Sequence, residues 1–408
     1  MRPPPFALPG LHFAAAICWL ALGAIGLVIV APGLSHGDFL SPRVFAVVHA
    51  FTLGVITTTI FGALYQFLPM ALGVTTRSVR AGFVGLGLLV TGTAALVAGF
   101  WAWWPAVQGM GWLLLFGAIA VHSWNLSPWR AGPEPGRVIA RYVAAGHTAL
   151  GLALFLAGCR IGESLGWWTL DRTGTIAAHF HLAALGFASL TAVGVGSRMI
   201  PMFLISHGTP EWPLRWIAPL ALIGLIVFTL GEVARWPSPA MAGAVLLVAA
   251  ALLHLHLARG YFRRRLRRRL DPALAHVVAA FAGLGLTVVL GVALLATPGF
   301  HPRQWIAYGL VAVLGWLVPF LLGILYKLIA HLSWIHFYGR RTGADAITVQ
   351  ALLSPRLAWS SLGLLCAGLL TLVAGIFSGI PVLAGSGAAI WCAGALLVPT
   401  QYLRMLTR

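Results

Sequence analysis

One pattern of histidine, glycine and proline occurs three times in this 408-residue chain, each time inside a hydrophobic run. In every copy the second glycine follows the first by 8 residues, and the proline position follows the first glycine by 15. The positions are His49, Gly54, Gly62 and Pro69 in the first copy, His181, Gly186, Gly194 and Pro201 in the second, and Leu310, Gly315, Gly323 and Ala330 in the third. The regular spacing predicts an internal repeat of one structural unit, and the third copy keeps the spacing without the histidine.

The composition places this repeat in a membrane. The chain is 60% hydrophobic and 8% charged, with a mean hydropathy of +0.93. A bilayer core of about 30 Å needs about 20 apolar residues per helix. Suitable runs lie near residues 11–31, 44–70, 80–100, 104–124, 138–159, 174–204, 214–233, 239–258, 273–297, 304–335, 357–379 and 382–403. We predict an all-α polytopic membrane protein with one membrane domain over residues 1–408, in which twelve transmembrane helices form three pseudo-repeated four-helix units, approximately 11–124, 138–258 and 273–403.

Arginine predicts the orientation, because cytoplasmic loops are rich in positive charge. One set of loops carries Arg77, Arg80, Arg130, Arg137, Arg141, Arg215, the run from Arg259 to Arg269, Arg340, Arg341 and Arg356. The opposite loops carry Arg43, Arg160, Arg172, Arg235 and Arg303. We therefore expect both termini in the cytoplasm of a bacterium, with the chain in the inner membrane. The net charge of +18 owes much to the arginine run, and in a short loop between two spans such a run indicates membrane lipid as the partner and no nucleic acid.

Several chemistries are excluded by what the sequence lacks. The four cysteines show no CxxC spacing, so we expect packing residues rather than a thiolate metal site. There is no phosphate loop, no HExxH and no CxxCH for covalent haem. With eight carboxylates in the whole chain, a calcium site or a carboxylate-driven proton pump lacks its ligands.

The histidines of the first two copies are the leading candidates for chemistry. An imidazole inside a membrane is costly without a partner, which favours a functional role over a hydrogen bond to a neighbouring carbonyl. His179 stands two positions before His181, and residues two apart on a helix point about 200° from each other. The two histidines cannot ligate one ion together. Since neutral imidazole is the usual axial ligand of haem iron, we expect His49 and His181 to hold one haem and His179 to face a second site.

The segments from His49 to Pro69 and from His179 to Pro201 resemble the haem-ligating helices of the haem-copper oxidase superfamily, in particular the large subunits of cbb3-type oxidases and nitric oxide reductases. The resemblance implies a twelve-helix fold of three four-helix arcs and one or two haem b groups. It also implies that His49 and His181 ligate a low-spin haem and that His179 is the proximal ligand of a high-spin haem. The resemblance in organisation covers the whole chain, and the motifs cover only the second and sixth helices.

The chain differs from that family in three respects. The family's His-x-His helix is the tenth and here it is the sixth; the seventh helix, which begins at Trp212, has no histidine to ligate copper; and the chain is short for a catalytic subunit. We therefore expect no copper and no copper-dependent reduction of oxygen to water. If the protein is an enzyme, an oxidoreductase is expected.

Other polar residues are weaker candidates for the site. His147 and His276 occupy one repeat position, before the second helices, and His331 follows the third copy's missing proline by one residue. Most remaining histidines are expected to meet water at the interface; they are His12, His122, His254, His256 and His336. Twelve residues after the first glycine of each copy stand Gln66, Arg198 and Lys327. This polar layer fits either a proton path or side chains that reach the lipid headgroups.

Two classes of function remain after these exclusions. The leading hypothesis is a membrane haem b protein that transfers electrons or binds or reduces a diatomic gas, O₂ or NO, with a cytochrome or a quinol as electron donor. The alternative is a transporter, such as a metal- or haem-handling permease, or a non-catalytic assembly or sensor subunit on the same scaffold. The three parallel repeats differ from the two halves or inverted pairs of many carriers.

Overall fold

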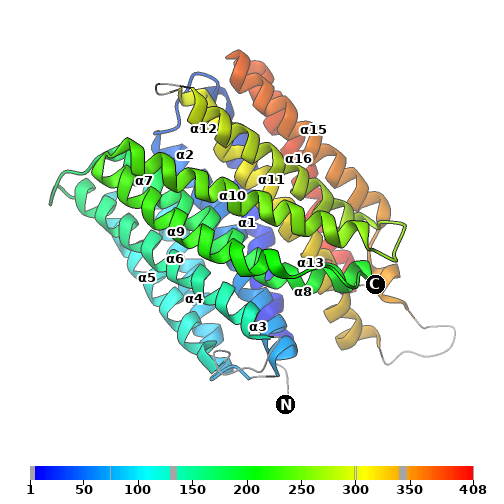
Figure 1. The fold of residues 1–408 in the computed structure, drawn as a ribbon. Helices are drawn as coiled ribbons and strands as arrows, with labels where there is room; N and C mark the ends of the chain where they lie inside the picture. The colour runs from blue at the N-terminus through cyan, green and yellow to red at the C-terminus, as the bar shows by residue number, and fades with distance from the viewer. Residues whose placement is uncertain are drawn as a thin grey trace. The chain divides into compact units, whose positions relative to one another are not determined.

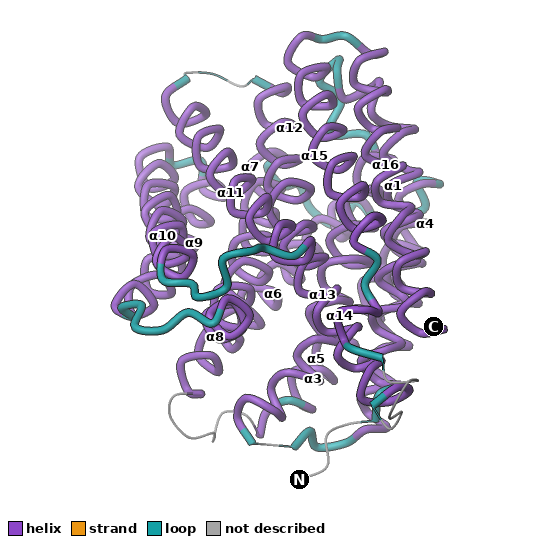
Figure 2. The backbone as a smooth tube through the Cα atoms, turned by 90° about the vertical axis from the view of Figure 1, so that its right-hand side faces the viewer, coloured by secondary structure: helices purple, strands orange, loops and turns teal. Residues whose placement is uncertain are grey.

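A computed structural model describes residues 5–73, 75–128, 136–297, 299, 301–339 and 347–407. Twelve helical stretches in this part of the chain are long and apolar enough to cross a membrane, which confirms the predicted number of spans. No β-strand occurs among these residues, and Figure 2 accordingly shows only helix and loop. The protein is therefore a multi-pass, all-α membrane protein. Arg130, Arg340 and Arg341, which contribute to the predicted orientation, lie outside the described residues.

The helices follow the predicted spans closely (Figure 1). The first third contains α1 (Ala7–Leu34), α2 (Pro42–His49), α3 (Thr58–Leu72), α4 (Val79–Trp101) and α5 (Pro105–Asn125). The middle third contains α6 (Gly136–Ser164), α7 (Arg172–His181), α8 (Leu190–Leu204), α9 (Trp212–Ala234) and α10 (Pro237–Arg263). The last third contains α11 (Pro272–Ala296), α12 (Pro302–Leu310), α13 (Val318–Ser333), α14 (Val349–Leu352), α15 (Pro355–Ser378) and α16 (Pro381–Thr407).

Three spans change from α-helix to π-helix and back to α-helix without a break in the chain's helical course. The segments are η1 (Ala50–Thr57) between α2 and α3, η3 (Leu182–Ser189) between α7 and α8, and η4 (Val311–Leu317) between α12 and α13; a further one, η5 (Trp334–Tyr338), follows α13. The spans that contain η1, η3 and η4 are the most enclosed of the twelve. Their most apolar windows are 72%, 61% and 89% buried, against 56% or less for the others. The second helix of each predicted repeat is thus an interior helix.

The contacts divide the chain into two compact units. Unit 1 includes Phe67–Arg268 and Leu284–Pro298, and unit 2 includes Pro4–Gln66, Arg269–Gly283 and Gly299–Arg408. Two of the divisions fall inside helices, in α3 and α11, whereas the division between Arg268 and Arg269 falls in the loop between the second and third predicted repeats. A cluster of buried apolar residues in unit 1 joins α6, η3, α9 and α10; its members are Ala149, Ala153, Leu182, Leu225, Phe228 and Leu247.

One helical hairpin geometry recurs at three places, in α4–α5, α9–α10 and α15–α16. The second helix of each hairpin begins with proline, and the residue three positions later meets a glycine of the first helix. A Cβ added to Gly231 would lie 2.3 Å from the backbone nitrogen of Ala240, and a Cβ added to Gly375 would lie 2.3 Å from that of Ala384. Glycine is needed here because the backbones touch, which is how apolar helices associate closely in lipid. Figure 1 shows α15 and α16 side by side.

Candidate functional site

Each copy of the repeated motif changes its helix type directly after the histidine position. The α-helix ends at His49, His181 and Leu310, and η1, η3 and η4 begin at the next residue. The backbone N–H groups of Thr58, Leu190 and Val318 accordingly donate to carbonyls five residues earlier. π-Helical turns are rare and occur frequently at functional sites. The histidine position of the repeat is therefore marked in the structure, by the change to π-helix, as well as in the sequence.

Side-chain hydroxyls support the π geometry in the two copies that carry histidine. Thr57 donates to the Thr52 carbonyl, and Ser189 donates to the Ala184 carbonyl, both at 2.9 Å and both five residues back along the chain. Both hydroxyls stand eight residues after the histidine. The third copy has no hydroxyl at this position, but Pro319 follows η4 and has no N–H to donate to the carbonyl four residues back. The same backbone deviation is thus supported by different residues.

The imidazoles of His49 and His181 are held in one tautomer. Nδ1 of His49 lies 2.7 Å from the carbonyl oxygen of Phe45, and Nδ1 of His181 lies 2.8 Å from that of Ala177. A carbonyl only accepts, so Nδ1 carries the proton in the neutral ring and Nε2 presents its lone pair. This is the usual state of a metal-ligating histidine, whose other ring nitrogen donates to a carbonyl or carboxylate.

The start of α7 is fixed by a charged cap at Asp171. The Asp171 carboxylate accepts from the backbone N–H of Gly174 at 2.8 Å and pairs with Arg235, which directly follows α9. The Arg235 guanidinium, and then the Gly174 N–H, hold the pKa of Asp171 below its usual range. A Cβ added to Gly174 would lie 2.3 Å from the Glu232 carbonyl oxygen, so α7 and α9 approach closely. These contacts position the helix that carries His179 and His181.

His179 and His181 contact different helices, as their spacing predicts. Nδ1 of His179 lies 2.9 Å from the carbonyl oxygen of Ala153 on α6, so its bond joins two helices. The ring of His181 instead lies 4.4 Å, between centroids, from the ring of Phe228 on α9. His181 is 6% exposed. The two imidazoles therefore lie in different surroundings. In His179, as in His181, the proton is on Nδ1 and the lone pair is on Nε2.

These donors fit a haem better than a compact metal site. Among the described residues no three His, Cys, Asp or Glu side chains gather closely enough to hold a metal ion. Haem iron needs only one or two protein ligands, because the porphyrin supplies the other four. A neutral imidazole with the proton on Nδ1 and the lone pair on Nε2 is a form that can ligate haem iron. His49 lies in unit 2 and His179 and His181 lie in unit 1.

The expectation that most remaining histidines meet water at the interface is wrong for His12, His122 and His254, and the weaker site candidates His147 and His276 are buried as well. His12, His122, His147, His254 and His276 are each 9% exposed or less. The reason is local for three of them: Nδ1 of His12, His147 and His276 lies 2.8 Å from the carbonyl oxygen four residues earlier, which offsets the cost of burial. His256, His331 and His336 are exposed, as expected for the interface.

His147 forms a buried pair that the sequence did not reveal. Its Nε2 lies 3.1 Å from Nδ1 of His122 on α5, and the two rings are nearly parallel. Since Nδ1 of His147 already donates to the Val143 carbonyl, the proton between the rings belongs to His122. No spacing rule predicts this contact, because the partners lie on different helices.

The predicted equivalence of His147 and His276 does not hold in the packing. A Cβ on Gly62 would lie 2.5 Å from Cβ of His12, and one on Gly323 would lie 3.2 Å from Cβ of His276. In the middle copy a Cβ on Gly194 would instead meet Cβ of Tyr142, five residues before His147. The α6 helix is therefore placed in a different register from that predicted, and His147 and His276 have unrelated neighbours.

The His276 imidazole lies in a polar pair within unit 2. Its ring is perpendicular to that of Tyr326, with centroids 5.2 Å apart, and Nε2 is buried without a hydrogen-bond partner. His12 and Tyr65 form a similar pair, with ring centroids 5.5 Å apart. A histidine on the first helix thus meets a tyrosine three residues after the second glycine in two copies.

The predicted polar layer does not share one environment. Gln66 is 7% exposed, Arg198 is exposed, and Lys327 pairs with Asp271 at the start of α11. Asp271 lies 56 residues from Lys327 in the sequence, and only the packing of α11 on α13 brings them together. The layer therefore consists of a buried amide, an exposed cation and a neutralised cation rather than a row of matched groups.

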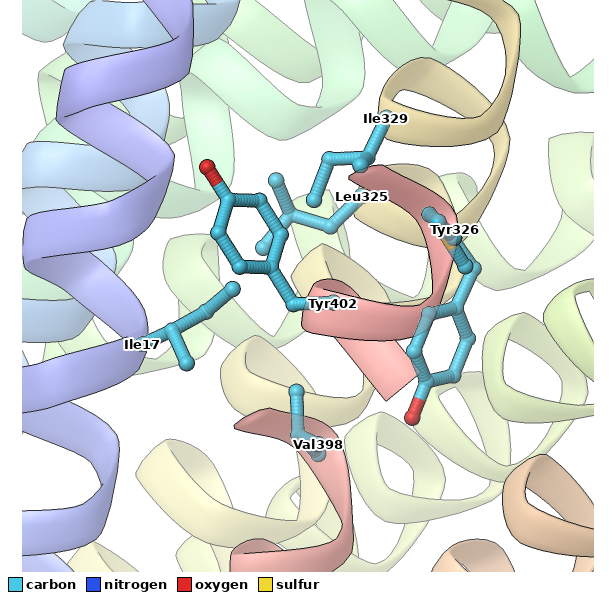
Figure 3. Close-up of a pocket in the computed structure, with 7 residues that line it drawn as sticks. Ile17, Leu325, Tyr326, Ile329, Val398 and Tyr402 are labelled. Atoms are coloured by element: carbon cyan, nitrogen blue, oxygen red, sulfur yellow. The ribbon is translucent and has the colours of Figure 1, made fainter. Parts of the chain in front are cut away.

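A small pocket in unit 2 lies beside Tyr326 and has no histidine, cysteine or carboxylate in its lining. It is lined by Ile17, Leu325, Tyr326, Ile329, Val398, Tyr402 and Met405. Figure 3 shows the Tyr402 ring between Ile17 on one side and Leu325 and Ile329 on the other. The Tyr402 hydroxyl donates to the Gly10 carbonyl at 3.2 Å, which joins α16 to α1. The pocket is apolar, and we interpret it as a small gap between packed side chains.

No protein-family model matches the sequence, and a search of the curated proteins finds no match. The fold defines the class, an all-α polytopic membrane protein with twelve candidate spans. Within that class the function is inferred from the histidines and their hydrogen bonds.

Proposed function

We propose that the chain is a haem b protein of the bacterial cytoplasmic membrane, on a scaffold like that of the haem-copper oxidase superfamily. His49 and His181 ligate haem iron through Nε2, and His179 is the ligand of a second haem. The observation that carries the proposal is the shared geometry of His49 and His181. Each ends an α-helix directly before a π-helical segment. Each also donates Nδ1–H to the carbonyl four residues earlier, which fixes the tautomer; His12, His147 and His276 make the same bond without the change of helix type.

The side chains support this role by orientation and burial. The carbonyls of Phe45 and Ala177 fix the tautomer and make each imidazole a stronger donor. Both histidines stand on interior spans, and His181 is itself buried, which would limit the access of water to a bound metal. When bound, haem b supplies an iron that accepts or gives one electron, and with an open position it binds a diatomic gas. Electron transfer and the binding or reduction of O₂ or NO are the reactions that this arrangement serves, with a cytochrome or quinol as donor.

The optical spectrum of the protein purified from haem-replete cells tests the proposal. We expect sharp α and β bands in the reduced protein. His49→Ala and His181→Ala each remove the bands of the low-spin haem, while the matched variant His256→Ala, which changes an exposed histidine, leaves them unchanged. Metal analysis should find iron without equimolar copper.

Wild-type protein that inserts normally and contains no haem would refute the proposal and leave the permease as the leading alternative. Equal loss of haem in His256→Ala would show that the spectrum reports general damage. One copper per haem-bearing chain would contradict the expectation drawn from the missing histidines of α9.

A further inference from the structure

Three buried polar groups without partners lie where two loops of unit 1 meet. One loop joins α8 to α9, and the other follows α10 and contains the arginine run. Ser206 forms an antiparallel bridge with Arg265, and the backbone N–H groups of Leu266 and Arg267 donate to the Ile205 and Leu204 carbonyls at 3.3 and 3.2 Å. The two loops, teal in Figure 2, are thus joined by their backbones.

Three buried polar atoms in these loops lack a hydrogen-bond partner. Oγ of Ser206, Oγ1 of Thr209 and Nε of Arg265 are all buried and have no partner. Ser206 is 8% exposed. The Arg265 guanidinium is positioned by a bond from Nη1 to the Phe262 carbonyl at 2.6 Å. Buried polar groups are almost always satisfied, so three unsatisfied ones in joined segments indicate a missing partner.

The chemistry of the three groups indicates what that partner is. An arginine Nε–H can only donate, and each of the two hydroxyls can donate to an acceptor as well. The surrounding charge is positive: the segments from 204 to 211 and from 260 to 268 contain five arginines and one carboxylate, Glu211. Arg264 adds a second guanidinium, since its Nη1 lies 3.6 Å from where a Cβ on Gly208 would be. Arginine and hydroxyl donors together recognise phosphoryl oxygens.

We propose that Ser206, Thr209 and Arg265 form a binding site for a phosphoryl group. The site is independent of the haem proposal and more specific than a charged loop that meets lipid. Two sources supply this chemistry, the headgroup of an anionic phospholipid and a free phosphate or pyrophosphate. In either case the ligand accepts from Arg265 Nε–H and from at least one hydroxyl.

The test uses the full-length protein and its thermal unfolding midpoint. In neutral detergent the probes are inorganic phosphate and pyrophosphate at matched ionic strength. In nanodiscs the comparison is phosphatidylcholine alone against phosphatidylcholine with phosphatidylglycerol. A ligand that binds only the folded state raises the midpoint. The variants are Arg265→Gln and Ser206→Ala, and Arg268→Gln is the control because it removes the same charge from an exposed neighbour.

We expect wild type and Arg268→Gln to respond alike, and Arg265→Gln to bind about tenfold more weakly, as the loss of one charge-assisted hydrogen bond implies. Ser206→Ala should leave the midpoint without ligand unchanged or higher, because it removes an unsatisfied hydroxyl, and should lower the response to ligand. If Arg265→Gln fails to fold, Ser206→Ala still tests the proposal, because its midpoint without ligand and its response to ligand should change in opposite directions.

A response to the soluble anions identifies a free phosphate site, and a response only to phosphatidylglycerol identifies a headgroup site. The proposal is overturned if wild type responds to neither, or if Arg268→Gln loses the response as fully as Arg265→Gln. The second result would mean that diffuse charge, and not a built site, attracts the anion.

Discussion

The close contact between α9 and α10 at Gly231 gives a quantitative prediction about stability. A Cβ on Gly231 would lie 2.3 Å from the backbone nitrogen and 2.7 Å from Cα of Ala240. Ordinary Cβ contacts begin near 3.4 Å, so the helices must separate by about 1 Å. Because the obstacle is backbone, no side-chain rotation relieves it. Overpacking of this kind costs about 1–3 kcal/mol, and we expect Gly231→Ala to destabilise the protein by that amount.

Gly151 on α6 is the matched control. A Cβ there meets nothing within 4 Å, so Gly151→Ala should stabilise the helix by about 0.5–1 kcal/mol through its propensity alone. The two variants should therefore differ by roughly 1.5–4 kcal/mol in the free energy of unfolding. Titration of the folded protein with a denaturing detergent measures both midpoints. If Gly231→Ala unfolds at the same detergent fraction as Gly151→Ala, the close approach of α9 and α10 is wrong.

Two further predictions concern α7. His179→Ala should abolish carbon monoxide binding and leave the spectrum of the His49–His181 haem largely intact; persistence of carbon monoxide binding, or loss of both signals, would make His179 a structural contact to Ala153. The depressed pKa of Asp171 means that its ion pair stabilises the folded state above the ordinary carboxyl pKa and that this contribution is lost as pH falls through the folded value. Asp171→Asn, which can still cap the helix, should therefore be less stable than wild type at neutral pH, and the difference should begin to shrink below about pH 4 and vanish only below the depressed folded pKa. A difference that does not change between pH 7 and pH 3 would exclude the charge as its cause.

The spacing of hydrophobic residues was sufficient to predict the class of fold. Apolar runs of about 20 residues leave few alternatives to a membrane helix, because every backbone polar group must be satisfied within the segment. All twelve predicted spans are confirmed. The separation of His179 and His181 onto different neighbours followed from helix geometry alone, since a two-residue step turns the side chain by about 200°.

Contacts between helices were decided only by the tertiary structure. The change to π-helix after His49 and His181 depends on hydroxyls eight residues later and on the packing around them. The hydrophobic periodicity of the sequence does not predict it. His147 meets His122, and Lys327 meets Asp271, because helices distant in sequence pack in one register. The sequence by itself determined which segments cross the membrane and where imidazoles stand along them, because both depend on the order of residues along a helix. Which buried groups meet, and which are left without a partner, was decided by the packing, because a side chain's neighbours across a helix interface depend on the rotation and depth of both helices.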